Sequence, residues 1–307
     1  MRIGIFDSGV GGLIIARAIQ KMMPEYDYVY LGDTKRVPYG TRSHETVYEF
    51  TREGVDYLFK KENCAIVIIA CNTASARALR RIQQEYLVDY NHLRNILGES
   101  SRNVIGVLIP TAEECAKYKK VGITGTNGTI VSNTFPDEIK KINLQKKNDL
   151  MLFHGSHSNL NVVNEANVAY AEKSTNHFSF TKVFQNPAPM LVPMAEEGEK
   201  ILAKPFLIKY LKPLLAKKPE AIALGCTHYP FFKAEIRKIV GKNMKIISQD
   251  EIVPKKLKEY FERHPEITKK LAKNKKAKIL VTDITKNVEK LTKEWFGKNT
   301  KPELVQI

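Results

Sequence analysis

The chain has few cysteines and no long hydrophobic segment, and each shortage excludes a class of protein. Its 307 residues include four cysteines, at positions 64, 71, 115 and 226, and none of them forms a C-x-x-C pair. That spacing is typical of zinc ribbons and dithiol redox proteins, so neither class is indicated. No segment approaches the run of about 20 apolar residues that spans a bilayer, so no membrane partner is expected.

Secretory and nucleotide-binding motifs are also missing. The start at Met1–Phe6 is strand-like and lacks the apolar stretch and cleavage site of a secretory signal. We therefore expect a cytoplasmic protein, where thiols stay reduced. The turn Asp7-Ser8-Gly9-Val10-Gly11-Gly12 does not fit the dinucleotide pattern G-x-G-x-x-G, and no Gly-Lys-Ser/Thr triplet follows it. It still presents an Asp and a Ser at a strand end, although a turn needed only for packing would explain the same residues.

The charge of the chain is strongly positive, with a formal net value of +16. Much of the excess lies in the last third, at 255–258 and 269–276, where lysines alternate with Glu, Leu and Tyr. This pattern is typical of a solvated helix face. No zinc-finger, helix-turn-helix or RNA-recognition signature accompanies the charge, so a nucleic-acid partner is not expected.

Strand and helix patterns alternate along most of the chain, which at this length can hold two domains. The sequence predicts strands at 1–7, 28–31, 65–70, 104–108, 120–124, 221–224, 244–248 and 278–282, and helices at 11–23, 43–61, 73–86, 195–215, 231–240, 253–264 and 286–296. This order predicts an α/β protein with mostly parallel sheets flanked by helices. The polar stretch 150–181 interrupts the alternation, and we expect it to be an insertion.

Two of the cysteines stand in matching settings. Cys71 follows the apolar run 65–70 and Cys226 follows the run 221–225, and a helix-compatible stretch comes after each. Such runs are typical of buried parallel strands, whose carboxyl ends carry the ligand sites of open α/β sheets. A helix N-terminus stabilises a thiolate, and His228 adds a titratable imidazole near Cys226. Two thiols at two strand ends suggest a pair of acid/base groups facing one substrate.

Three other interpretations of these cysteines stay open. Each thiol alone could be a buried structural side chain. Cys226 and His228 could bind zinc together with His154 and His157, although the spacing matches no established template. Cys226 could also be the nucleophile of a hydrolase with His228 as its base, which would leave Cys71 without a role.

Several segments together resemble glutamate racemases of the aspartate/glutamate racemase superfamily. The matching segments are 5–12, 32–34 with 37–40, 70–76, 125–130, 192–193 with 196–198, and 224–230. The two cysteine segments are the most specific as a pair, and 7–12 with 38–40 favour glutamate over aspartate racemases.

The resemblance implies a cofactor-independent enzyme with two pseudo-symmetric α/β domains and an active site at their interface. The corresponding domains are residues 1–100 plus 242–307, and 101–241 with the insertion at 150–181. One cysteine thiolate would remove the α-proton of glutamate while the opposite thiol returns a proton to the other face. The product, D-glutamate, would supply peptidoglycan synthesis, and the enzyme would be a homodimer without a metal.

The same resemblance assigns roles to residues at the matching positions. Cys71 and Cys226 would be the acid/base groups, with Asp7 assisting the first and His228 with Glu196 assisting the second, and Asp33 acting more remotely. The amino acid would be bound by Asp7, Ser8, Pro38, Tyr39, Gly40, Asn72, Thr73, Thr126, Thr129, Thr227 and His228. The alternatives are a related racemase that acts on aspartate or a similar acid, and a basic nucleic-acid-binding protein on a racemase scaffold.

Overall fold

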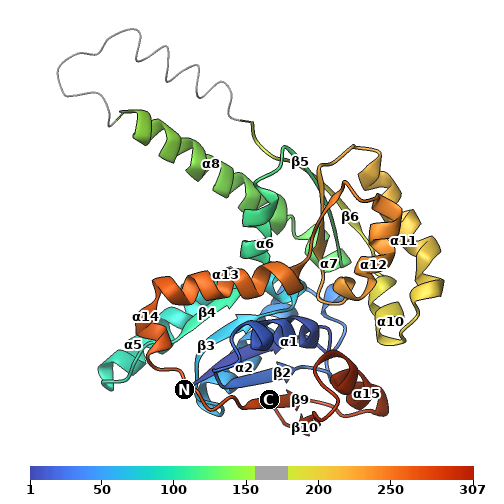
Figure 1. Cartoon of the computed structure of the whole chain (residues 1–307). Helices are drawn as coiled ribbons and strands as arrows, with labels where there is room; N and C mark the ends of the chain where they lie inside the picture. Colours follow the sequence, from blue (N-terminus) through green and yellow to red (C-terminus); the bar gives the residue numbers. More distant parts are fainter. Residues whose placement is uncertain (156–178) are drawn as a thin grey trace, which may run out of the picture.

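The computed structural model describes residues 1–155 and 179–307, which form two β-sheets surrounded by helices (Figure 1). One sheet has six strands in the order β10-β9-β2-β1-β3-β4, and the other has four in the order β6-β5-β7-β8. All strand pairings in the described ranges are parallel. The predicted α/β class with mostly parallel sheets is therefore confirmed. Within the same ranges, no helix has the length and apolar character needed to cross a bilayer.

The elements have the following bounds. The six-stranded sheet contains β1 (Arg2–Asp7), β2 (Tyr28–Gly32), β3 (Cys64–Ile69), β4 (Asn103–Gly106), β9 (Ala277–Val281) and β10 (Glu303–Leu304). The four-stranded sheet contains β5 (Lys120–Gly125), β6 (Lys182–Pro187), β7 (Ala221–Gly225) and β8 (Lys245–Ile247). The helices are α1 (Gly12–Met22), α2 (His44–Lys60), α3 (Asn72–Arg77), α4 (Leu79–Arg81), α5 (Leu87–Ile96), α6 (Leu108–Cys115), α7 (Asn127–Val131), α8 (Thr134–Gly155), α10 (Leu191–Glu196), α11 (Lys200–Leu215), α12 (Lys233–Val240), α13 (Gln249–Arg263), α14 (Pro265–Thr268) and α15 (Lys286–Trp295), with single turns at Tyr39–Thr41, Ile82–Tyr86 and Tyr229–Phe232.

The central strands are apolar almost throughout because helices cover both of their faces. All residues of β3 and of β7 are buried, as expected for strands in the middle of a parallel sheet. The register pairs Asp7 with Gly32, and Phe6 with Ile69. The carboxyl ends of β1, β2 and β3 therefore lie together at one edge of the six-stranded sheet.

The chain crosses between the sheets twice. It leaves the six-stranded sheet through α6, after β4, and returns through α13, after β8. Helix α13 packs against both α6 and α1. We propose two domains divided at these crossovers, residues 1–107 plus 248–307 and residues 108–247. The boundaries that the sequence predicts, at 100 and 241, would instead separate β4 from the six-stranded sheet and β8 from the four-stranded sheet.

Some predicted elements differ from those observed. The helix predicted over 195–215 is divided into α10 and α11, because Gly198 adopts a φ of +77° that ends the first helix. Helix α8 and strand β6 were not predicted, since α8 is mostly polar and β6 is a half-buried edge strand. Helix α8 extends into the predicted insertion as far as Gly155, and residues 156–178 of that insertion lie outside the described ranges.

Candidate active site

A cavity of about 390 Å³ lies at the carboxyl ends of strands from both sheets. Most of the residues that the sequence assigns to the site line it: Ser8, Pro38, Tyr39, Gly40, Cys71, Asn72, Thr73, Thr126, Glu196, Cys226, Thr227 and His228. Asp7 and Thr129 do not line the cavity and lie directly behind its wall. Both cysteine thiols that the sequence singles out therefore open onto the same space.

Cys71 lies two residues after the end of β3 and caps the N-terminus of α3. Its Sγ accepts a hydrogen bond of 3.4 Å from the backbone N–H of Ala74, which fixes the thiol at the start of the helix. Burial and the nearby Asp7 carboxylate together raise the pKa of the Cys71 thiol to about 12, against the opposing effect of hydrogen bonds from Ser8 and Ala74. Cys71 is thus a protonated thiol at neutral pH.

Asp7 ends β1 and is held behind Cys71 by the glycine-rich turn. Its Oδ2 accepts hydrogen bonds of 3.1 Å from the backbone N–H groups of Gly9 and Gly12. A Cβ at Gly12 would lie 2.7 Å from the Cβ of Asp7, so a side chain at this position would displace the carboxylate. Burial raises the pKa of Asp7, although His228 and the turn N–H groups oppose this rise.

Cys226 follows β7 and faces the cavity from the four-stranded sheet. Its Sγ lies 3.8 Å from Nδ1 of His228, and Nε2 of the same imidazole lies 2.9 Å from Oε1 of Glu196. Burial alone would lower the pKa of His228, but the contacts with Cys226 and Glu196 raise it to about 10. The imidazole is therefore cationic at neutral pH and lies beside the Cys226 thiol. The two thiols therefore stand in opposite electrostatic settings.

His228 is held in place by residues from α15 and from the turn before α1, which belong to the half of the molecule with the six-stranded sheet. The ring of Trp295, at the end of α15, makes an edge contact with it at a centroid separation of 5.7 Å. On another side, an added Cβ at Gly11 would lie 2.4 Å from the imidazole, so only glycine leaves room there. The position of this imidazole thus depends on how the two sheets pack.

Three hydroxyl groups join the sheets at the cavity wall. The Oγ1 of Thr126 lies 2.9 Å from that of Thr73 and 3.0 Å from that of Thr129. Thr126 also caps α7, because its Oγ1 accepts a hydrogen bond from the backbone N–H of Thr129. The loop at Gly40 passes so close to this helix that a Cβ at Gly128 would lie 2.8 Å from the Gly40 carbonyl oxygen.

The loop that carries Pro38 and Tyr39 is fastened by Asp33. The Tyr39 hydroxyl donates a hydrogen bond of 2.6 Å to Oδ2 of Asp33. The same carboxylate accepts from Arg36 at 2.6 Å and from the Thr282 hydroxyl at 2.8 Å. Asp33 is fully buried and does not line the cavity, so its contacts hold the loop.

Sequence reasoning missed several groups at this site. Gly9, Val37, Thr41, Asn127, Pro189, Val192 and Pro193 also line the cavity. Two further side chains, Trp295 and Gln249, contact site residues from the C-terminal segment. No local signal could identify these two, since the contacts depend on how remote elements pack.

The alternative interpretations of Cys226 can be compared with this geometry. Cys71 opens onto the same cavity, whereas the hydrolase interpretation gives it no role. The zinc interpretation depends on His154 and His157. His154 belongs to the last turn of α8, and His157 lies outside the described residues. Among the residues that the structure describes, no three His, Cys, Asp or Glu side chains gather as a metal site would require.

Two thiols with different charged neighbours, open to one small buried space between two parallel sheets, are typical of an α/β enzyme that moves protons. No family model matches the chain. It is 30% identical over 309 residues to the glutamate racemase of Aquifex aeolicus, covering 99% of this chain and 97% of that protein.

Solved structures give the same result. The glutamate racemase isoform RacE1 of Bacillus anthracis matches with a TM-score of 0.77 and 28% identity, over 100% of this chain and 97% of that one. The glutamate racemase of Francisella tularensis, solved in complex with D-glutamate, matches with a TM-score of 0.74 and 27% identity, over 99% and 97%. The chain belongs to the glutamate racemase family, as the resemblance of its motifs predicted.

Proposed function

We propose that this protein is a cofactor-independent glutamate racemase in which Cys71 and Cys226 act on opposite faces of Cα. The observation that carries the proposal is that both thiols open onto one buried cavity, from strand ends of two different sheets. Racemisation needs a base on one face of the carbon and an acid on the other. The solved relative in complex with D-glutamate supports glutamate as the substrate.

The proton balance of the reaction follows from the two thiols. One cysteine, as the thiolate, takes the α-hydrogen as a proton and becomes a thiol. The electron pair left on Cα is delocalised into the substrate carboxylate. The opposite thiol then gives its proton to the other face and becomes a thiolate, so each turnover leaves the two cysteines with exchanged protonation states. The free enzyme must exchange these protons before it acts again on the same enantiomer.

The neighbouring groups have distinct roles in this proposal. Asp7 lies behind Cys71 and serves as its proton partner, while His228, oriented by Glu196, serves Cys226. The carbanion-like transition state is stabilised by prearranged polar groups in a site that excludes water. Hydroxyl and amide groups of the wall suit the carboxylates and the ammonium group of the amino acid: Ser8, Asn72, Thr73, Thr126 and Thr227.

The proposal also covers the metabolic role, location and oligomeric state of the enzyme, which are inferred from the family. The D-glutamate would supply peptidoglycan synthesis in the cytoplasm, and the enzyme would work as a homodimer. Exposed apolar side chains on α11, such as Ile201 and Leu202, are suited to a contact between subunits. Size-exclusion chromatography with light scattering measures the oligomeric state.

A direct assay tests the activity. The purified protein is incubated with L-glutamate without pyridoxal phosphate, and circular dichroism follows the loss of optical activity. We expect decay to zero, with the same end point from D-glutamate. Decay with L-aspartate but not with L-glutamate would favour the related racemase. An inactive protein with steeply salt-dependent affinity for DNA would favour the nucleic-acid-binding alternative.

A further inference from the structure

The side-chain amide of Asn72 is held by a glutamine that lies far away in the sequence. Nδ2 of Asn72 donates to Oε1 of Gln249 at 2.8 Å, and Nε2 of Gln249 donates to Oδ1 of Asn72, also at 2.8 Å. Both side chains are buried, with exposed fractions of 2% for Asn72 and 0% for Gln249. The two amides therefore form a closed pair that water does not compete for.

This pairing fixes how Asn72 presents its amide to the cavity. A primary amide has two N–H donors and two acceptor lone pairs. One donor and one lone pair of Asn72 are used by Gln249, which leaves one of each for the cavity that Asn72 lines. If the Asn72 amide rotated by half a turn, both hydrogen bonds would become repulsive contacts. Gln249 thus determines where Asn72 offers a donor and where it offers an acceptor.

Gln249 also joins Asn72 to both connections between the sheets. Gln249 is the first residue of α13, the returning crossover. Its Nε2 makes a further hydrogen bond of 3.1 Å to the hydroxyl of Thr111, which belongs to α6, the outgoing crossover. Asn72 itself follows Cys71 at the end of β3. A single buried glutamine therefore connects the residue next to Cys71 with the two segments that set the relative position of the sheets.

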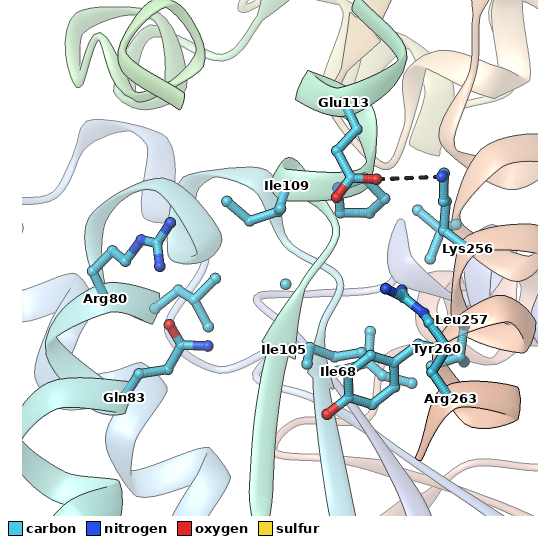
Figure 2. A pocket seen from close by; sticks show the side chains of 14 residues that line it. Ile68, Arg80, Gln83, Ile105, Ile109, Glu113, Lys256, Leu257, Tyr260 and Arg263 are labelled. Carbon is cyan, nitrogen blue, oxygen red and sulfur yellow. Dashed lines mark ion pairs between the residues drawn. The ribbon is translucent and has the colours of Figure 1, made fainter. Parts of the chain in front are cut away.

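Another polar contact between the crossovers is of a different kind. Figure 2 shows Glu113 of α6 facing Lys256 of α13 at the edge of a second cavity, with an N–O distance of 3.4 Å. Both side chains are partly exposed, and solvent screens such a pair. This ion pair links the same two helices but does not reach Asn72, which makes Lys256 a matched control for Gln249.

We propose that Gln249 is a positioning residue for the substrate, which acts by holding the Asn72 amide in the orientation that binds glutamate. The inference rests on the proposed function, because it assigns Asn72 to glutamate binding. A correctly oriented Asn72 contacts the bound substrate in its ground state and in its transition state alike. Loss of the pair should therefore weaken binding more than it slows the chemical step.

Steady-state kinetics of Gln249→Met test this role. Methionine has a similar length and volume but offers no amide hydrogen bonds. We expect KM for glutamate to rise about tenfold, the equivalent of one good hydrogen bond, while kcat falls less than threefold. Lys256→Met should leave both constants within about twofold of wild type. A loss in kcat at unchanged KM would show that Gln249 contributes only to the fraction of folded enzyme, and would overturn the proposal.

A double-mutant cycle with Asn72→Ala gives the second readout. If Gln249 acts through Asn72, adding Gln249→Met to Asn72→Ala should change kcat/KM less than twofold. Additive losses would contradict the proposal.

Should Gln249→Met fail to fold, Gln249→Glu serves instead. Its carboxylate keeps the length and accepts a hydrogen bond from Asn72 but cannot donate one to it. An intermediate rise in KM is expected for Gln249→Glu, and an unchanged KM would contradict the role. If the wild-type protein does not racemise glutamate, the proposed function fails; an active wild type with unaffected variants removes only the role of Gln249.

Discussion

The Sγ of Cys226 lies 3.8 Å from Nδ1 of His228, and the contacts of this imidazole with Cys226 and Glu196 raise its pKa to about 10. Cys71, which opens onto the same cavity, lies near the buried carboxylate of Asp7 instead. One thiol therefore has a cation beside it, and the other has a carboxylate nearby. In the proposed mechanism, this difference would let two identical side chains act as base and acid in turn.

Replacing either thiol should abolish racemisation. In Cys71→Ser or Cys226→Ser, a hydroxyl with a much higher pKa takes the place of the thiol and cannot serve as a base. We expect kcat to fall by a factor on the order of 10³ in each variant, as measured by circular dichroism with either enantiomer. Cys64→Ala and Cys115→Ala are controls, because these thiols are buried outside the cavity, and they should keep most of the activity. Near-wild-type rates in either serine variant would show that its thiol is dispensable.

His228→Asn should affect one half of the reaction more than the other. Enantiomers have equal free energies, so kcat/KM must fall by the same factor in both directions. The step in which Cys226 removes the proton should nevertheless become more rate-limiting. We therefore expect the primary isotope effect with α-deuterated glutamate to increase for one enantiomer and to stay the same for the other. An equal change for both enantiomers would contradict a specific link between His228 and Cys226.

The stability of the protein should depend on pH through the same imidazole. Burial lowers the pKa of His228, but Cys226 and Glu196 raise it from 6.5 to about 10, so the folded state binds the proton more tightly than the unfolded chain. This contribution is fully present below pH 6.5 and is lost as the pH rises through 10. Urea unfolding should show the advantage of wild type over His228→Asn declining by about 1.4 kcal/mol per pH unit across this window. A difference that is constant with pH would mean that His228 is neutral in the folded protein.

Gly11→Ala should damage the site without unfolding the protein. The added Cβ would lie 2.4 Å from the His228 ring and 2.5 Å from the Thr227 hydroxyl. The imidazole must therefore move away from Cys226, and we expect a fall in kcat/KM of about 10²-fold with a modest loss in melting temperature. Gly297→Ala is the matched control, because its nearest neighbour would be 3.4 Å away. Full activity of Gly11→Ala would show that His228 tolerates displacement.

The sequence predicted those parts of the fold whose signal is local. The strands β1, β3 and β7 are nearly continuous apolar runs, and burial on both faces produces that pattern. Helix α8 was missed because its polar composition gives little periodicity, and the division between α10 and α11 depends on one glycine with a positive φ.

The site shows the same limit. Cys71 and Cys226 could be found because each stands at the end of a buried strand. The pairing of Asn72 with Gln249 and the contact of Trp295 with His228 could not be predicted, since each joins elements that are far apart in the sequence. Such contacts arise from the packing of the two sheets, and no spacing in the sequence records them.

The origin of the proton on the product tests the central claim most directly. Racemisation of L-glutamate is started in deuterated water, and the D-glutamate formed in the first few per cent of reaction is analysed by mass spectrometry. With thiols on opposite faces, the hydrogen removed by one never reaches the other face, so the first D-glutamate should carry deuterium at Cα in every molecule. A substantial fraction of D-glutamate that retains the original hydrogen would mean that a single group removes and returns it, which would contradict the two-thiol account.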